Sequence, residues 1–130
     1  MAISENDKKL ILEKVISIMK KYKGKLMENK SSSNGYELIG NTPTPYGSSK
    51  KIVPGMYFAS TTSRKNSVVF YFFPCYTQPQ SFKKVAPQTM KCLEGKTCFH
   101  FTDTTQVVEK EIAAMFQLGI EFYKKEGWIK

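Results

Sequence analysis

The chain has 130 residues, 41% of them hydrophobic and 13% aromatic, which predicts one folded domain spanning residues 1–130 and excludes a disordered chain. Twenty Lys and Arg against eleven Asp and Glu give a net charge of +9, which favours an anionic partner. No apolar run approaches the roughly 18 residues of a membrane span, and no export signal precedes Cys75, Cys92 and Cys98. We therefore expect a cytoplasmic protein with free thiols and no membrane contact.

The first predicted element is a helix that begins after Ser4, a residue type that caps helices. Its apolar positions have helical spacing, and lysines occupy much of the other side. A basic amphipathic helix can lie on a membrane, but we expect this one to pack on the core with its basic face in water. The apolar positions are Leu12, Val15, Ile16, Met19 and Tyr22, and the basic ones are Lys8, Lys9, Lys20, Lys21 and Lys23.

Strands dominate the middle of the chain. After a linker at residues 31–35 we expect a short strand near residues 36–39, a long loop from Gly40 to Ser49 and a strand from Met56 to Thr61. Residues 63–66 form a hairpin connection, and the next strand runs from Ser67 to Phe73. Alternation along this strand places Val68, Phe70 and Phe72 on one face and Val69, Tyr71 and Phe73 on the other.

The last third begins at Pro74, which ends the aromatic strand. Residues 75–93 are expected to be irregular or briefly helical, and Gly95 turns into a fourth strand from Thr97 to Phe101. Asp103 or Thr104 caps a final helix that runs to about Lys125. The order predicts an α+β two-layer sandwich: a small antiparallel or mixed sheet of four or five strands, with the N- and C-terminal helices on one face.

Between Leu38 and Leu93 the chain has no Asp or Glu, although this stretch holds its most aromatic segment. Hydrolysis by a carboxylate pair and a carboxylate metal cage are therefore excluded within the segment. An anionic ligand is favoured instead. The cations of the segment are Lys50, Lys51, Arg64, Lys65, Lys83, Lys84 and Lys91.

The fourth strand carries the candidate reactive groups. Alternation points Lys96, Cys98 and His100 to one face, and Phe99 and Phe101 to the core. Cys98 and His100 form a soft ligand pair, but zinc requires three or four ligands. Side chains two apart on a strand are also too distant for a direct Cys–His dyad, so Cys75 or Cys92 would have to supply a nucleophile. A half-buried thiol and a hydrogen-bonded imidazole explain the pair better than a functional site does, and we expect no enzyme activity.

Three blocks of sequence resemble one family. They are Pro54-Gly55-Met56-Tyr57-Phe58-Ala59, Phe70-Tyr71-Phe72-Phe73-Pro74, and Gly95-Lys96-Thr97-Cys98-Phe99-His100-Phe101 with the helix that follows. Together they resemble the YdhG-like family, domain of unknown function 1801, over residues 8–128. The resemblance implies a small α+β sandwich similar to frataxin. For one branch it implies an intracellular iron chaperone, and it is the sole reason to consider iron as a cofactor or cargo.

The residues themselves point to a non-enzymatic binding module for an anionic small molecule or an acidic partner. One site lies on the uncovered sheet face, and another lies under the Pro43–Ser49 loop, where Tyr46, Lys50 and Lys51 would meet Lys96 and His100. Single-stranded nucleic acid stacked on Tyr57, Tyr71 or Phe73 beside Arg64 and Lys65 is an alternative, as is a homodimer through the second sheet face. The candidate ligand-binding residues are Tyr46, Lys50, Lys51, Arg64, Tyr71, Lys96, Cys98 and His100.

Overall fold

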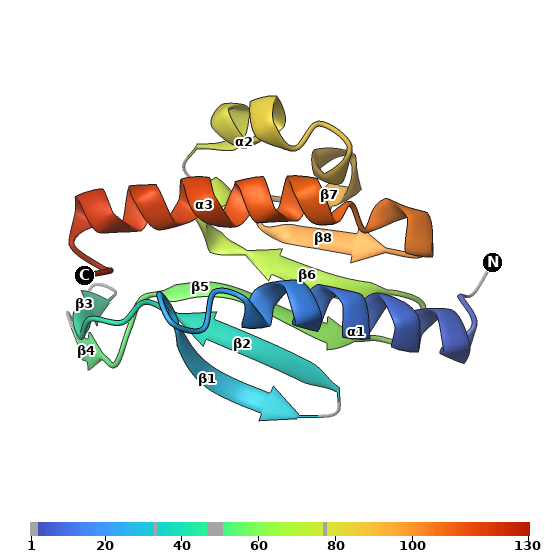
Figure 1. The fold of residues 1–130 in the computed structure, drawn as a ribbon, viewed down its shortest axis with the longest axis horizontal. Coiled ribbons are helices and arrows are strands. Elements are labelled where there is room, and N and C mark those ends of the chain that lie inside the picture. The colour runs from blue at the N-terminus through green and yellow to red at the C-terminus, as the bar shows by residue number, and fades with distance from the viewer. Residues whose placement is uncertain (1–2, 33, 47–50, 77) are drawn as a thin grey trace.

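The computed structural model describes residues 3–32, 34–46, 51–76 and 78–130. It is an α+β two-layer sandwich in which the helices α1 (Glu5–Lys20) and α3 (Glu109–Glu126) pack on the same face of a six-stranded sheet (Figure 1). This confirms the predicted fold class. None of the helices in the described ranges is both long and apolar enough to cross a membrane.

The sheet has the strand order β1-β2-β5-β6-β8-β7, and every neighbouring pair is antiparallel. It therefore has more strands than the four or five predicted. A separate two-stranded sheet, β3 with β4, occupies part of the predicted Gly40–Ser49 loop and the residues after it. The bounds are β1 Met27–Ser32, β2 Gly35–Ile39, β3 Thr44–Tyr46, β4 Lys51–Val53, β5 Tyr57–Ser63, β6 Val68–Phe72, β7 Leu93–Glu94 and β8 Cys98–Phe101.

Short helices connect β6 to the last two strands, in agreement with the irregular or briefly helical segment predicted there. They are η1 (Phe73–Tyr76), α2 (Pro79–Val85) and η2 (Thr89–Cys92). The predicted cap of the last helix is wrong. Asp103 caps η3 (Thr104–Gln106) through a capping box with Gln106, and α3 begins only after Val108.

The first helix begins as predicted, because the Ser4 hydroxyl accepts the Asp7 amide at 3.1 Å. Lys8 was expected on its solvated face but is 7% exposed. Its Nζ donates to the main-chain oxygens of Arg64 and Lys65, both at 3.1 Å, and pairs with Glu5 at 2.7 Å. Burial of a cation is tolerated here because carbonyl and carboxylate oxygens replace its water. Lys8 thus fastens the β5–β6 hairpin to α1.

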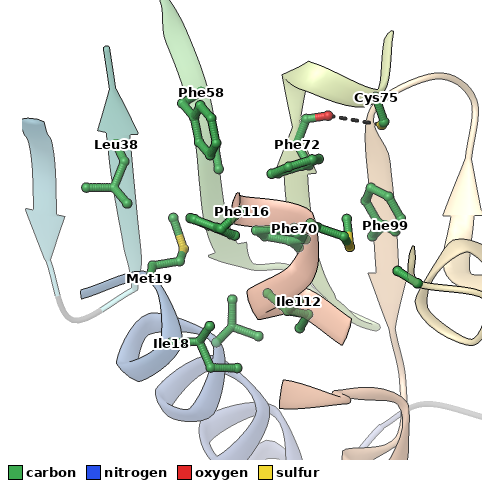
Figure 2. Close-up of a cluster of buried hydrophobic side chains, with 14 of the residues drawn as sticks. Ile18, Met19, Leu38, Phe58, Phe70, Phe72, Cys75, Phe99, Ile112 and Phe116 are labelled. Carbon is green, nitrogen blue, oxygen red and sulfur yellow. Dashed lines mark hydrogen bonds between the residues drawn. The ribbon is translucent and has the colours of Figure 1, made fainter. Parts of the chain in front are cut away.

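The core is aromatic and is centred on Phe116 of α3 (Figure 2). Its ring lies 5.3 to 6.2 Å from those of Phe58, Phe70 and Phe72, within the range of favourable aromatic pairs. The alternation predicted for β6 is confirmed on this side, since Val68, Phe70 and Phe72 are fully buried. Phe99 and Phe101 are also fully buried, as predicted for β8.

A bulge in β5 determines which of its side chains point into the core and which point to the opposite face of the sheet. The pairing of β2 with β5 passes from Ala59 to Tyr57 and skips Phe58. Phe58 and Ala59 are both in the core, and Tyr57 is displaced to the opposite face. Without this extra residue, strict alternation would not place Phe58 and Ala59 together.

Candidate functional site

The side of the six-stranded sheet away from α1 and α3 is here called the open face (Figure 1). Residues directly opposite each other on antiparallel strands share a face. Strand pairing therefore assigns to the open face one row that crosses all six strands and a second, shorter row beside it. The first row is Lys30, Glu37, Ser60, Tyr71, Cys98 and Glu94, and the second is Gly35, Thr62, Val69 and His100.

Small hydroxyl side chains form much of the floor of the open face. Ser60 and Thr62 on β5 are partly exposed, and both line a shallow cavity of about 250 Å³ that also includes Gly35 and Lys30. Tyr71 on the neighbouring strand is larger and is also partly exposed. The open face is therefore accessible to a ligand and carries hydrogen-bonding groups.

Arg64 is attached to this face through Tyr71. The residue is exposed in the β5–β6 hairpin, and its Nη2 donates to the Tyr71 hydroxyl at 3.0 Å. Because Lys8 holds the main-chain oxygen of Arg64, the hairpin that carries the guanidinium is fixed to the helix layer. These two predicted site residues, Arg64 and Tyr71, are brought together by the fold.

A second group of rings lies at the other end of β6. The Tyr57 and Phe73 ring centroids are 6.2 Å apart, and Phe73 and Tyr76 stack at 5.8 Å with an interplanar angle of 17°. Lys96 Nζ lies 4.9 Å from the centroid of the Tyr76 ring, which is a cation–π contact. Tyr76 is 48% exposed and was not among the predicted site residues. The sequence feature that could have identified Tyr76 is its position three residues after Phe73, because a 3₁₀ turn places residues three apart on the same side.

The β6 strip is our name for these two groups taken together. One group is a cation of the β5–β6 hairpin with a tyrosine of β6, and the other is three rings in contact with a cation that precedes β8. The members of the β6 strip are Arg64, Tyr71, Tyr57, Phe73, Tyr76 and Lys96.

Tyr57 is the least accessible hydroxyl of the β6 strip. It shares a hydrogen bond with Ser60 at 2.5 Å, and its carbonyl oxygen accepts the Tyr123 hydroxyl. Burial raises the pKa of Tyr57 to about 12, so the phenol is neutral at physiological pH. Tyr57 therefore contributes a ring and no charge to the β6 strip.

Two carboxylates flank the β6 strip, and the count of acidic residues between Leu38 and Leu93 included neither of them. Glu37 and Glu94 stand just outside the acid-free stretch, yet strand pairing places them on the open face, on β2 and β7. Glu37 accepts the Asn29 side-chain amide at 2.5 Å, and Glu94 lies 3.1 Å from His100 Nε2. The open face is thus less cationic than the sequence suggests.

Among the described residues no hydrogen bond joins His100 to a thiol, although Cys92 lines the same surface cavity as His100 and Glu94. His100 contacts Glu94, and the Cys98 thiol lies 4.0 Å from the Thr97 hydroxyl. Cys75 is buried with its thiol 3.1 Å from the carbonyl oxygens of Phe72 and Lys96, and burial raises its pKa to about 12 (Figure 2). Burial also raises the pKa of Cys92. Thiols held in the protonated form are poor nucleophiles and poor metal ligands.

The predicted site under the Pro43–Ser49 loop is not assembled by the described residues. Tyr46 and Lys51 pair with each other across β3 and β4, while Lys96 and His100 belong to the β8 side of the main sheet (Figure 1). Lys50 lies outside the described residues. In the same described ranges no group of three or more His, Cys, Asp or Glu is placed to hold a metal ion.

A further cavity, of about 420 Å³, borders the β6 strip at Phe73. Phe122, Tyr123 and Trp128 supply aromatic walls, and Gln78, Lys125 and Glu126 supply polar groups. Its volume is within the range typical of small-molecule sites.

Comparisons with protein-family models, with curated proteins and with solved structures found no match to this chain. The resemblance to the YdhG-like family and the iron-chaperone role that it implies therefore stay predictions. Function is inferred below from the geometry and chemistry of the open face.

Proposed function

We propose that this protein is a non-enzymatic binding module that takes an anionic ligand along the β6 strip. The observation that supports it is the pairing of each of the two cations of the β6 strip with a tyrosine. Arg64 donates to the Tyr71 hydroxyl, and Lys96 lies on the Tyr76 ring. The tyrosines orient the cations, which reduces the side-chain entropy that binding an anion would cost.

The rest of the open face suits the same ligand. Ser60 and Thr62 lie beside the β6 strip and offer hydroxyl donors to anionic oxygens. The net charge of +9 raises the encounter rate with any anion, whereas Glu37 and Glu94 repel one that strays to the flanks. The ligand is therefore expected to lie along β6 and not across the sheet.

The experiment is a calorimetric titration with inorganic triphosphate at low and at physiological ionic strength. The wild type is compared with the double variant Arg64→Gln/Lys96→Gln and with the matched control Lys83→Gln/Lys84→Gln, which removes two exposed lysines of α2 and gives the same net charge. We expect binding that weakens with salt and falls about tenfold in the first double variant alone. Equal losses in both variants would show attraction by net charge only and refute the β6 strip as the site.

A further inference from the structure

Building on the proposed function, we infer that the anionic ligand is a single-stranded nucleic acid, with bases stacked on the exposed rings of the β6 strip and phosphates against Arg64 and Lys96. A small inorganic anion would need the two cations but has no use for the aromatic rings between them. A nucleotide chain presents both a phosphate and a π-face at every residue, so it accounts for both features.

The exposure of the rings indicates where bases stack. Tyr76 is 48% exposed, and its ring continues the stack of Phe73 at 5.8 Å. Tyr71 is partly exposed beside the small residues Ser60 and Cys98, which rise less far from the sheet than a phenol ring does. Tyr57 and Phe73 are less exposed than Tyr76, and Phe73 contacts both of these tyrosine rings.

Single strands fit better than a duplex, because a duplex hides the faces of its bases in its own stack. An acidic peptide fits less well, because it brings no base to stack and would approach Glu37 and Glu94 with its own carboxylates. With two cations on the β6 strip, the number of neutralised phosphates is small. The logarithm of affinity should fall with the logarithm of salt with a slope of about −1.4, since each phosphate on a single strand contributes about −0.7.

The first test uses fluorescence anisotropy with four labelled probes of about ten nucleotides: oligo-uridine, oligo-thymidine, an abasic strand with the same number of phosphates, and a duplex. An acidic peptide of similar charge is the fifth probe. We expect both single-stranded oligonucleotides to bind at least tenfold more tightly than the abasic strand, the duplex and the peptide. Tighter binding of either oligonucleotide than of the other supports the inference, because both are single strands.

The remaining outcomes overturn it in distinguishable ways. If the abasic strand binds as tightly as the oligonucleotides, the anion site stands and the nucleic-acid inference fails. If the peptide binds most tightly, the partner is an acidic protein. If no probe binds, the inference fails, and the triphosphate titration alone decides the proposed function.

Variants locate the stacking rings. Tyr76→Leu and Tyr71→Leu should each weaken oligo-uridine binding about tenfold and weaken binding of the abasic strand much less, because that strand loses only the orientation of a cation and no stacking. Tyr71→Phe keeps the ring but loses the hydroxyl that Arg64 contacts, so it should retain most of the oligonucleotide affinity. The matched control is Tyr46→Leu on β3, which removes a ring that is 49% exposed and lies outside the β6 strip. Equal losses in the control, in proteins with unchanged thermal melting, would refute the assignment.

Discussion

Lys8→Met tests whether the buried ammonium of α1 holds the hairpin that carries Arg64. Methionine keeps most of the apolar stem of lysine and removes the charged group. Two charge-assisted hydrogen bonds, to the oxygens of Arg64 and Lys65 at 3.1 Å, are lost, and each such bond contributes about 1.5 to 3 kcal/mol. Relief of the desolvation of Lys8 offsets part of this loss. We therefore expect a loss of about 2 to 3 kcal/mol in the free energy of unfolding.

The measurement is urea unfolding followed by circular dichroism. With a denaturant dependence of about 2 kcal/mol per molar, the midpoint should fall by about 1 to 1.5 M. Lys9→Met is the matched control, because Lys9 is the exposed neighbour on the same helix and its change should be within about 0.5 kcal/mol of zero. If Lys8→Met shifts the midpoint no more than Lys9→Met does, the anchoring role of Lys8 is refuted. A true anchor also predicts weaker triphosphate binding in Lys8→Met, because Arg64 loses its fixed main chain.

Three further predictions concern stability and reactivity. Gly55→Ala should destabilise the fold by about 3 kcal/mol or prevent folding, because the added Cβ would lie 1.8 Å from the main-chain oxygen of Gly40. Gly24→Ala is the control and should have the melting midpoint of the wild type, because its added Cβ would have no atom within 4 Å. The phenol of Tyr57 binds its proton more tightly in the folded state, so its contribution to stability should be complete below pH 10 and be lost as the pH rises towards 12. In Tyr57→Phe the melting midpoint should therefore fall less steeply with rising alkaline pH than in the wild type. An equally steep fall in both proteins would contradict the burial of the phenol. Cys75 should resist iodoacetamide until the protein unfolds, whereas the partly exposed Cys98 should react in the native state. Peptide mass spectrometry measures which cysteine is modified first, and modification of Cys75 before Cys98 would contradict this order.

The aromatic strand could be predicted from the sequence because it is a run of large apolar residues flanked by clear turn signals. Its pairing keeps the predicted alternation of Val68, Phe70 and Phe72 with Val69 and Tyr71, and Val69 is buried on the other face at 3% exposed. β1 could not be predicted in the same way. It is a polar edge strand, exposed at nearly every position, so nothing in its hydrophobic pattern separates it from a loop. The two-residue β7 is too short to show the alternation of apolar and polar residues by which a strand is predicted.

Those predicted site residues that are close in the chain were grouped as the structure has them, and those far apart in the chain were not. Arg64 and Tyr71 are close in the chain and lie on one hairpin, so local alternation suffices to place them together. Tyr46 and Lys51 were grouped with Lys96 and His100 by charge and chemistry alone, and pairing in a separate sheet places them elsewhere. The contribution of Glu94 depends on its register with Cys98, which no local pattern encodes.

Two rings of the β6 strip, Tyr71 and Tyr76, lie outside the core, whereas Phe73 packs against it. The core is complete on the helix side, where Phe116 contacts the rings of three strand residues, and the partly exposed members Tyr71 and Tyr76 are not part of it. Solubility alone would favour small polar or charged residues at these positions, as at Ser60 and Thr62 on the next strand. Single exposed rings are ordinary on protein surfaces, but two accessible tyrosines that each contact a cation, one of them stacked on a further ring, are a more specific arrangement. If the ligand binds as proposed, substitutions at Tyr71 and Tyr76 should weaken its binding without unfolding the protein, because neither side chain is part of the core.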